Sequence, residues 1–308
     1  MRLTFGILMS LMVGTAHANT DLAAAVENVR TTCGNISAEL NDMKKMAGIT
    51  TAVTSVGTVA GGVALGTGIA KANVDKEIEE WERILQELAI EQEKAEIVFT
   101  VINIEDVEKS LAQNPVAKLD LDNRLDKLNE KSKNLGNVRT GTMAVATATN
   151  IAGAVMSGTN RVKGDLKQQI DECLASVKTL SNVRMQARID GSTTDTDLVR
   201  AEEIIRACDA WTTVDVSSIN KRSTGATVSS GIGAGLGLAG TITSASANSD
   251  GVRNGDDTQR EKNLNTAANV LAGGTTAASL TATIFNATQI NAIKRAATVA
   301  DECEGALK

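Results

Sequence analysis

The sequence predicts a mainly α-helical protein in which two tandem antiparallel helical hairpins form an elongated bundle. Four long segments carry no charged residue and consist mostly of Ala, Gly, Thr, Ser, Val and Ile, namely 46–70, 140–160, 223–249 and 263–293. In the first segment, Ile49, Val53, Val56, Ala60 and Val63 follow the steps of three and four that are typical of a helix. Thr and Val also favour sheets, but most of these segments lack the period-two alternation of a strand.

The N-terminus has the pattern of a secretory signal peptide over residues 1–18. Arg2 gives a basic start, residues 3–13 are apolar, and Ala16 and Ala18 place small residues at the cleavage position. The first cysteine, Cys33, lies well beyond that position, which argues against a lipid-anchored lipoprotein. We therefore expect an exported protein, located in the periplasm or at the cell surface.

The composition argues against an enzyme. Signal cleavage would remove His17, the only histidine, and the chain has no tyrosine. This excludes His-dependent catalysis and His-ligated metals in the mature protein. Asp195 and Asp197 lack the terminal glutamate of a calcium loop. The formal net charge of -6 gives no support for nucleic-acid binding. We expect a noncatalytic protein with no cofactor and no metal.

The first predicted hairpin covers residues 19–189 and contains a charged insertion, residues 71–139. Within it Val74, Ile78 and Trp81 recur at helical spacing, which is typical of a coiled coil. The insertion could be a partner-binding tip, but its apolar residues more simply pack against the returning part of the same insertion. Its turn falls either near Asn103, the centre of symmetry, or at Pro115, the only proline.

The second predicted hairpin covers residues 190–308. Residues 191–194 read as the joining loop, followed by a helix that Asp195 or Thr196 would cap. Residues 254–257 read as the central turn. Weak internal repeats support the duplication, because the triplet 171–173 recurs as 301–303 and the run 137–141 resembles 269–273.

Four cysteines in an exported chain predict two disulfides, for which three pairings are possible. The duplication selects one bridge per hairpin. We predict Cys33 paired with Cys173 and Cys208 paired with Cys303, because antiparallel helices centred near residues 103 and 255 would bring these pairs together.

Glycines one turn apart predict close helix packing, as in a glycine zipper. We expect packing contacts at Gly57, Gly61, Gly62, Gly66, Gly231, Gly233, Gly235 and Gly237. The same small-residue arms are the surface through which we expect the protein to self-associate.

Segment 46–70 is long enough to cross a bilayer. It is nevertheless poor in Leu, Ile and Phe, and basic residues flank the arms on the cysteine side, where the positive-inside rule disfavours them in an exported topology. Membrane insertion is therefore possible but not favoured.

These observations favour a noncatalytic exported structural or interaction protein of the cell envelope, which self-associates as a homo-oligomer or binds an envelope protein partner. The alternative is a secreted membrane-inserting or pore-forming helical protein. Solubility of the mature protein without detergent, followed by a liposome dye-release assay, distinguishes the two.

Overall fold

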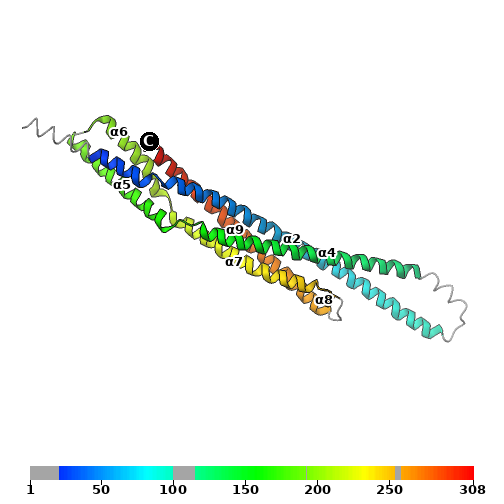
Figure 1. Cartoon of the computed structure of the whole chain (residues 1–308). Coiled ribbons are helices and arrows are strands. Elements are labelled where there is room, and N and C mark those ends of the chain that lie inside the picture. The colour runs from blue at the N-terminus through cyan, green and yellow to red at the C-terminus, as the bar shows by residue number, and fades with distance from the viewer. Residues whose placement is uncertain (1–20, 100–114, 192, 254–257) are drawn as a thin grey trace, which may run out of the picture. The chain divides into compact units, whose positions relative to one another are not determined.

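The structure is a computed structural model that describes residues 21–99, 115–191, 193–253 and 258–308. These residues are almost entirely helical and include no strand, which confirms the mainly α prediction. Four helices are long: α2 (Ile36–Phe99), α4 (Pro115–Thr159), α7 (Val216–Ala247) and α9 (Thr258–Ala306). The shorter ones are α5 (Gly164–Asp190), α6 (Asp195–Asp209), the 3-10 helix η1 (Ala210–Thr213) and α8 (Asp250–Arg253) (Figure 1). Residues 21–33 form a further helix before α2.

Several predicted features lie outside the described residues. These are the signal peptide over 1–18, the turn near Asn103 and the central turn over 254–257. Pro115 is the first residue of α4. A proline is well suited to the first position of a helix, where its missing N–H leaves no hydrogen bond unmade.

The chain divides into two compact units, and every long helix contributes a part to each. Unit 1 comprises the chain up to Val53, Gly153–Val228 and Thr281–Lys308. Unit 2 comprises Thr54–Ala152 and Ser229–Leu280. The predicted division into hairpins at residues 189 and 190 follows the order of the chain, and it stays a prediction.

In unit 2, neighbouring helices run antiparallel, because partner numbers fall along one helix as they rise along the other. Between α2 and α4 the contacts are Gly57 with Thr149 and Asp75 with Ser132. The helices α2 and α9 are antiparallel for the same reason, with the contacts Gly61–Thr276 and Lys71–Glu261. The contacts between α4 and α7 are Asn150–Gly233 and Arg139–Ser244. Those between α7 and α9 are Leu236–Gly274 and Gly240–Leu271. By contrast, α4 and α9 run parallel, since Arg139 contacts Asn269 and Asn150 contacts Ser279. They are therefore the diagonal helices of unit 2.

Unit 1 has a conventional apolar core. Large aliphatic side chains from its helices are buried with Trp211, among them Leu22, Ile36, Leu40, Leu166, Leu180, Ile204 and Ile293. All four cysteines belong to this core. Unit 1 therefore gains stability in the ordinary way, by removing apolar surface from water.

The connection between α5 and α6 in unit 1 is a loop, as predicted, but its cap differs. Gly191 ends α5 in the left-handed conformation at φ 61°, which glycine adopts without steric cost. Thr194 caps α6, because its Oγ1 accepts a hydrogen bond from the backbone N–H of Asp197 at 3.3 Å. The expected cap at Asp195 or Thr196 was wrong by one or two positions, since both of those residues already lie within the helix.

Candidate functional site

The interior of unit 2 is lined by small and polar side chains instead of large apolar ones. On α7 every buried position from Ser230 onward is Ser, Gly or Ala: Ser230, Gly233, Gly237, Gly240, Ser244 and Ala247. These residues repeat at steps of three and four, the spacing that places them on one face towards the partner helices. The buried face of α7 in unit 2 thus has the heptad spacing of a packed helix, with small residues at the buried positions.

Four of the eight predicted packing glycines face this interior. A Cβ added to Gly61 would lie 2.8 Å from Thr276 Oγ1 and 3.3 Å from its Cα. At Gly237 it would lie 2.5 Å from Thr147 Oγ1. Gly57 and Gly233 meet α4 equally closely. These separations are shorter than carbon side chains tolerate, so glycine is needed for the helices to approach.

The other four predicted glycines, Gly62, Gly66, Gly231 and Gly235, face outward. Their residues are exposed, and a Cβ added to any of them would meet no other atom within 4 Å. Within the described part of the chain they form no close helix contact. Any packing role for them therefore depends on a surface that lies outside one copy of this chain.

Polar side chains cross the interior between the diagonal helices. In unit 2, Asn150 on α4 donates from Nδ2 to Ser279 Oγ on α9 at 2.8 Å, and both side chains are buried. Unit 1 contains related contacts, in which Ser157 Oγ donates to Asn286 Oδ1 at 3.1 Å and Gln289 Nε2 donates to the Asn160 carbonyl at 2.7 Å. Buried polar groups are costly unless they are paired, so these contacts fix the helix register.

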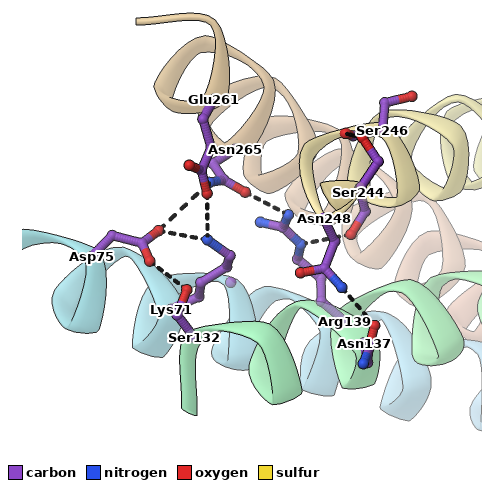
Figure 2. Close-up of polar contacts among 12 residues, drawn as sticks. Lys71, Asp75, Ser132, Asn137, Arg139, Ser244, Ser246, Asn248, Glu261 and Asn265 are labelled. Atoms are coloured by element: carbon purple, nitrogen blue, oxygen red, sulfur yellow. Dashed lines mark hydrogen bonds and ion pairs between the residues drawn. The ribbon is translucent and has the colours of Figure 1, made fainter. Parts of the chain in front are cut away.

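A charged cluster lies where the uncharged part of α2 ends. Lys71 is fully buried, and its Nζ lies 2.7 Å from Asp75 Oδ2 and 3.2 Å from Glu261 Oε1 on α9. Ser132 on α4 donates to Asp75 Oδ1 at 2.6 Å. Figure 2 shows Lys71, Asp75 and Glu261 pointing toward one another from two helices. A single cluster therefore joins three of the four long helices.

Arg139 on α4 extends the same cluster and is also fully buried. Its guanidinium donates to Ser244 Oγ at 2.8 Å and to Asn265 Oδ1 at 2.7 Å (Figure 2). It also donates to Asn269 Oδ1 at 3.2 Å. Burial lowers the pKa of Arg139, and the negative charges of Asp75 and Glu261 act in the opposite direction. Side-chain oxygens thus accept hydrogen bonds from three of the five N–H donors of this buried guanidinium.

The exterior of unit 2 is unusually apolar. Large aliphatic side chains stand exposed on all four long helices within the uncharged segments. We call this set the aliphatic exterior: Val56, Val59, Val63 and Ile69 on α2, Val145 and Ile151 on α4, Ile232, Leu238 and Ile242 on α7, and Val270 and Leu280 on α9. Among the described residues of unit 2, the large apolar side chains that are buried are Val74, Ile78 and Met143. Unit 2 thus reverses the usual distribution of polar and apolar residues.

The helical period seen in the first uncharged segment belongs to this outer surface. Ile49, Val56 and Val63 are exposed, whereas Thr50, Thr54 and Gly57 of the same helix are buried. Apolar residues at that spacing ordinarily face a core. In α2 they face away from it, and the buried face of the same stretch holds Gly, Ala and Thr instead.

The cysteines pair as the sequence predicts. Cys33 is bonded to Cys173 and Cys208 to Cys303. The Sγ atoms of Cys33, Cys208 and Cys303 all lie within 4.8 Å of one another, so the two bridges are adjacent inside unit 1. Such a group of sulfurs resembles a soft-metal site, but disulfide sulfurs lack the thiolate charge that binds a metal. The four cysteines thus form two adjacent disulfides that cross-link distant parts of the chain within unit 1.

Comparison with protein-family models, with curated proteins and with solved structures finds no match to this chain. By length and composition, one helical span among the described residues could cross a membrane, Asp21–Arg83, which covers the helix over 21–33 and most of α2. Of its most apolar stretch, 28% is buried. A core helix of a soluble protein is mostly buried over such a stretch.

Sequence reasoning missed the buried cluster and the polar interior. Lys71 and Arg139 appeared only as the ends of the charged insertion. One signal was present, because Ser223, Ser230, Gly237 and Ser244 recur at intervals of seven, the heptad period of a packed helix face.

Proposed function

We propose that this chain is a noncatalytic exported protein of the cell envelope, with a structural or interaction role. In this proposal the long helices form two tandem antiparallel hairpins, which the two disulfides clamp within unit 1. Unit 2 supplies the surface for interaction. The observation that carries the proposal is the reversal of polarity in unit 2, where polar groups hold the helices together and aliphatic groups face outward.

The buried polar groups support a structural role because they are engaged with one another. Lys71 pairs with Asp75 and Glu261, and Arg139 bonds to three side chains of α7 and α9. Groups held in this way are fixed in place and shielded from a substrate. The two disulfides are compatible with an oxidising compartment. Export itself rests on the signal-peptide pattern.

Self-association is part of the proposal. The outward glycines Gly62 and Gly66 lie on the same face of α2 as the exposed Val59 and Val63. That combination lets a helix of a second copy approach closely and exchange dispersion contacts over the glycines. Gly231 and Gly235 form a similar outward pair on α7.

Fractionation of the native cell tests the proposal. Immunodetection after separation of cytoplasm, periplasm, membranes and medium should find the processed chain, lacking residues 1–18, outside the cytoplasm. Native mass spectrometry of that fraction should show more than one copy per particle, or the chain with an envelope protein. Full-length, unprocessed chain confined to the cytoplasm would refute export and with it the proposed role.

A further inference from the structure

We infer that the hydrocarbon of a lipid bilayer is the partner that covers the aliphatic exterior of unit 2, apart from the outward glycine faces of α2 and α7 through which copies of the chain associate in the proposed function. The inference rests on the proposed function and names the partner of its interaction surface. In this inference the helices of unit 2 stay packed as in the structure, and their polar side chains stay inside the bundle.

The distribution of exposed aliphatic residues favours lipid over a second copy of the chain. Val270 on α9 is 69% exposed, Val59 on α2 is 67% exposed and Ile242 on α7 is 60% exposed. Residues of the same kind stand on α4. A partner protein covers one face of a bundle, whereas all four helices of unit 2 carry this surface. Lipid acyl chains surround a bundle on every side.

The absence of charge supports the same partner. No Asp, Glu, Lys or Arg occurs within residues 54–70, 140–152, 229–249 or 263–280, the parts of unit 2 that carry the aliphatic exterior. A water-exposed helical surface normally carries many charges. Charged side chains resume at Lys71, Arg139 and Lys262, where the uncharged parts of α2, α4 and α9 end.

Length can be compared directly for α2. Within unit 2 its uncharged part covers residues 54–70. At a rise of about 1.5 Å per residue this part extends about 25 Å, compared with about 30 Å for the hydrocarbon of a bilayer. The uncharged stretch of the same helix continues back to residue 46.

Several buried polar side chains of unit 2 meet the further requirement that lipid imposes, although the Oγ of the buried Ser230 has no hydrogen-bond partner among the described residues. Hydrocarbon offers no hydrogen-bonding partner, so polar side chains must be satisfied inside the protein. The amide of Asn150 bonds to Ser279, and the hydroxyls of Thr147 and Thr275 donate to backbone carbonyls of their own helices. Small residues with interhelical Asn and Ser bonds are the usual means by which helices associate in membranes.

This view explains why the sequence alone disfavoured a membrane. Hydropathy counts every residue of a helix, including the many Gly, Thr and Ser that make the uncharged segments look weakly apolar. In unit 2 the buried faces hold many of these residues, such as Thr54, Gly61 and Ser230, and the exposed faces hold the Val, Ile and Leu. A preassembled bundle therefore presents a more apolar surface than its separate helices.

Flotation with vesicles tests the inference. Oxidised mature protein, purified in mild detergent, is transferred to phosphatidylcholine vesicles that contain a lipid with a photoactivatable acyl chain, and the vesicles are floated through sucrose. Wild type should float, and peptide mapping after illumination should place acyl-chain adducts on the helices of unit 2 within the uncharged segments. Val270→Asp should reduce flotation at least ten-fold, because a carboxylate is strongly disfavoured in hydrocarbon.

A matched control is available in unit 1. Ile189 on α5 is 73% exposed, close to the value for Val270, and lies in a charged region of the chain. Ile189→Asp should float like wild type. Circular dichroism and thermal melting of both variants establish that they fold, which is expected because both side chains are exposed.

Three results would overturn the inference. Wild-type protein could remain in the aqueous fraction. It could form a water-soluble oligomer that Val270→Asp dissociates, which would assign the aliphatic exterior to a second copy. The two variants could also lose flotation equally, which would mean nonspecific adhesion. Each result leaves the proposed envelope role standing if native fractionation finds processed protein outside the cytoplasm, so the two failures are distinguishable.

Discussion

Asn150 lies directly over Gly233 in unit 2. A Cβ on Gly233 would lie 2.9 Å from both the Cγ and the Nδ2 of Asn150. The asparagine cannot simply move aside, because its amide bonds to the buried Ser279 on the diagonal helix. One glycine on α7 thus allows a hydrogen bond between α4 and α9.

Replacing Gly233 by Leu should therefore destabilise the protein. The larger side chain would displace Asn150 and break its bond to Ser279, with an expected loss of about 1 to 3 kcal/mol in the free energy of unfolding from overpacking. Urea denaturation followed by circular dichroism measures the change. Gly235→Leu is the matched control, because Gly235 lies two residues away on the same helix and faces open space. If Gly235→Leu destabilises as much as Gly233→Leu, close packing is not the cause.

Lys71 should contribute strongly to the stability of unit 2. Lys71→Met removes the buried cation and leaves Asp75 and Glu261 close together without it. We expect a loss of about 3 kcal/mol, at the low end for breaking a buried pair, because the two carboxylates retain some contact with water. Thermal or urea unfolding provides the measurement.

The control for Lys71 is Lys262, whose ion pair with Glu79 is about half exposed on both sides. Lys262→Met should change the free energy of unfolding by less than about 1 kcal/mol, as exposed pairs usually do. Equal effects of the two substitutions would contradict the distinction between the buried cluster and surface ion pairs.

Asp215 should make stability depend on pH at the start of α7. Hydrogen bonds from the Ser217 hydroxyl and the Ser218 backbone N–H lower the pKa of Asp215. Because the folded pKa lies below the unfolded value, the contribution is fully present above the unfolded pKa. It is lost as pH falls through the folded pKa.

Asp215→Ala should therefore lower the melting temperature at neutral pH, and the difference from wild type should shrink in strong acid to the part that a neutral capping acceptor supplies. Asp215→Asn keeps a capping acceptor without a charge and should restore part of the melting temperature at neutral pH. A difference between wild type and Asp215→Ala that persists unchanged in strong acid would rule out the charged cap as its cause.

The disulfide between Cys208 and Cys303 closes a loop of 95 residues. Replacing both cysteines by Ala should lower stability by about 4 to 5 kcal/mol on chain-entropy grounds. The melting temperature should fall while the helical circular dichroism at low temperature stays the same. Loss of helicity at low temperature would show that the bridge is needed for folding itself.

The sequence was sufficient for helix and for cysteine pairing, because both depend on spacing along the chain. Cys33 and Cys173 have numbers that sum to 206, as do Gly57 and Thr149, which meet between α2 and α4. The positions of the two cysteines in the sequence therefore already give the register in which α2 and α4 pair.

Spacing could not show which face of each helix is buried. The aliphatic face of α2 and the face with Thr54 and Gly57 have the same period, and burial of the apolar one is the ordinary expectation. Within the uncharged parts of unit 2 the buried positions hold Gly, Ala, Ser, Thr and Asn together with Met143, and the Val and Ile residues are not among them. Likewise, burial of Lys71 requires a carboxylate from α9, more than a hundred residues away, and a single-helix pattern contains no such information.

Nonreducing peptide mapping of the protein isolated from its native cell is the most direct test of an exported, disulfide-clamped bundle. Thiols are blocked at lysis, so that the cellular redox state is preserved. The account predicts peptides joined through Cys33–Cys173 and Cys208–Cys303, with no free thiol. Four blocked thiols, or a peptide that joins Cys173 to Cys208, would contradict both the clamp and the compartment.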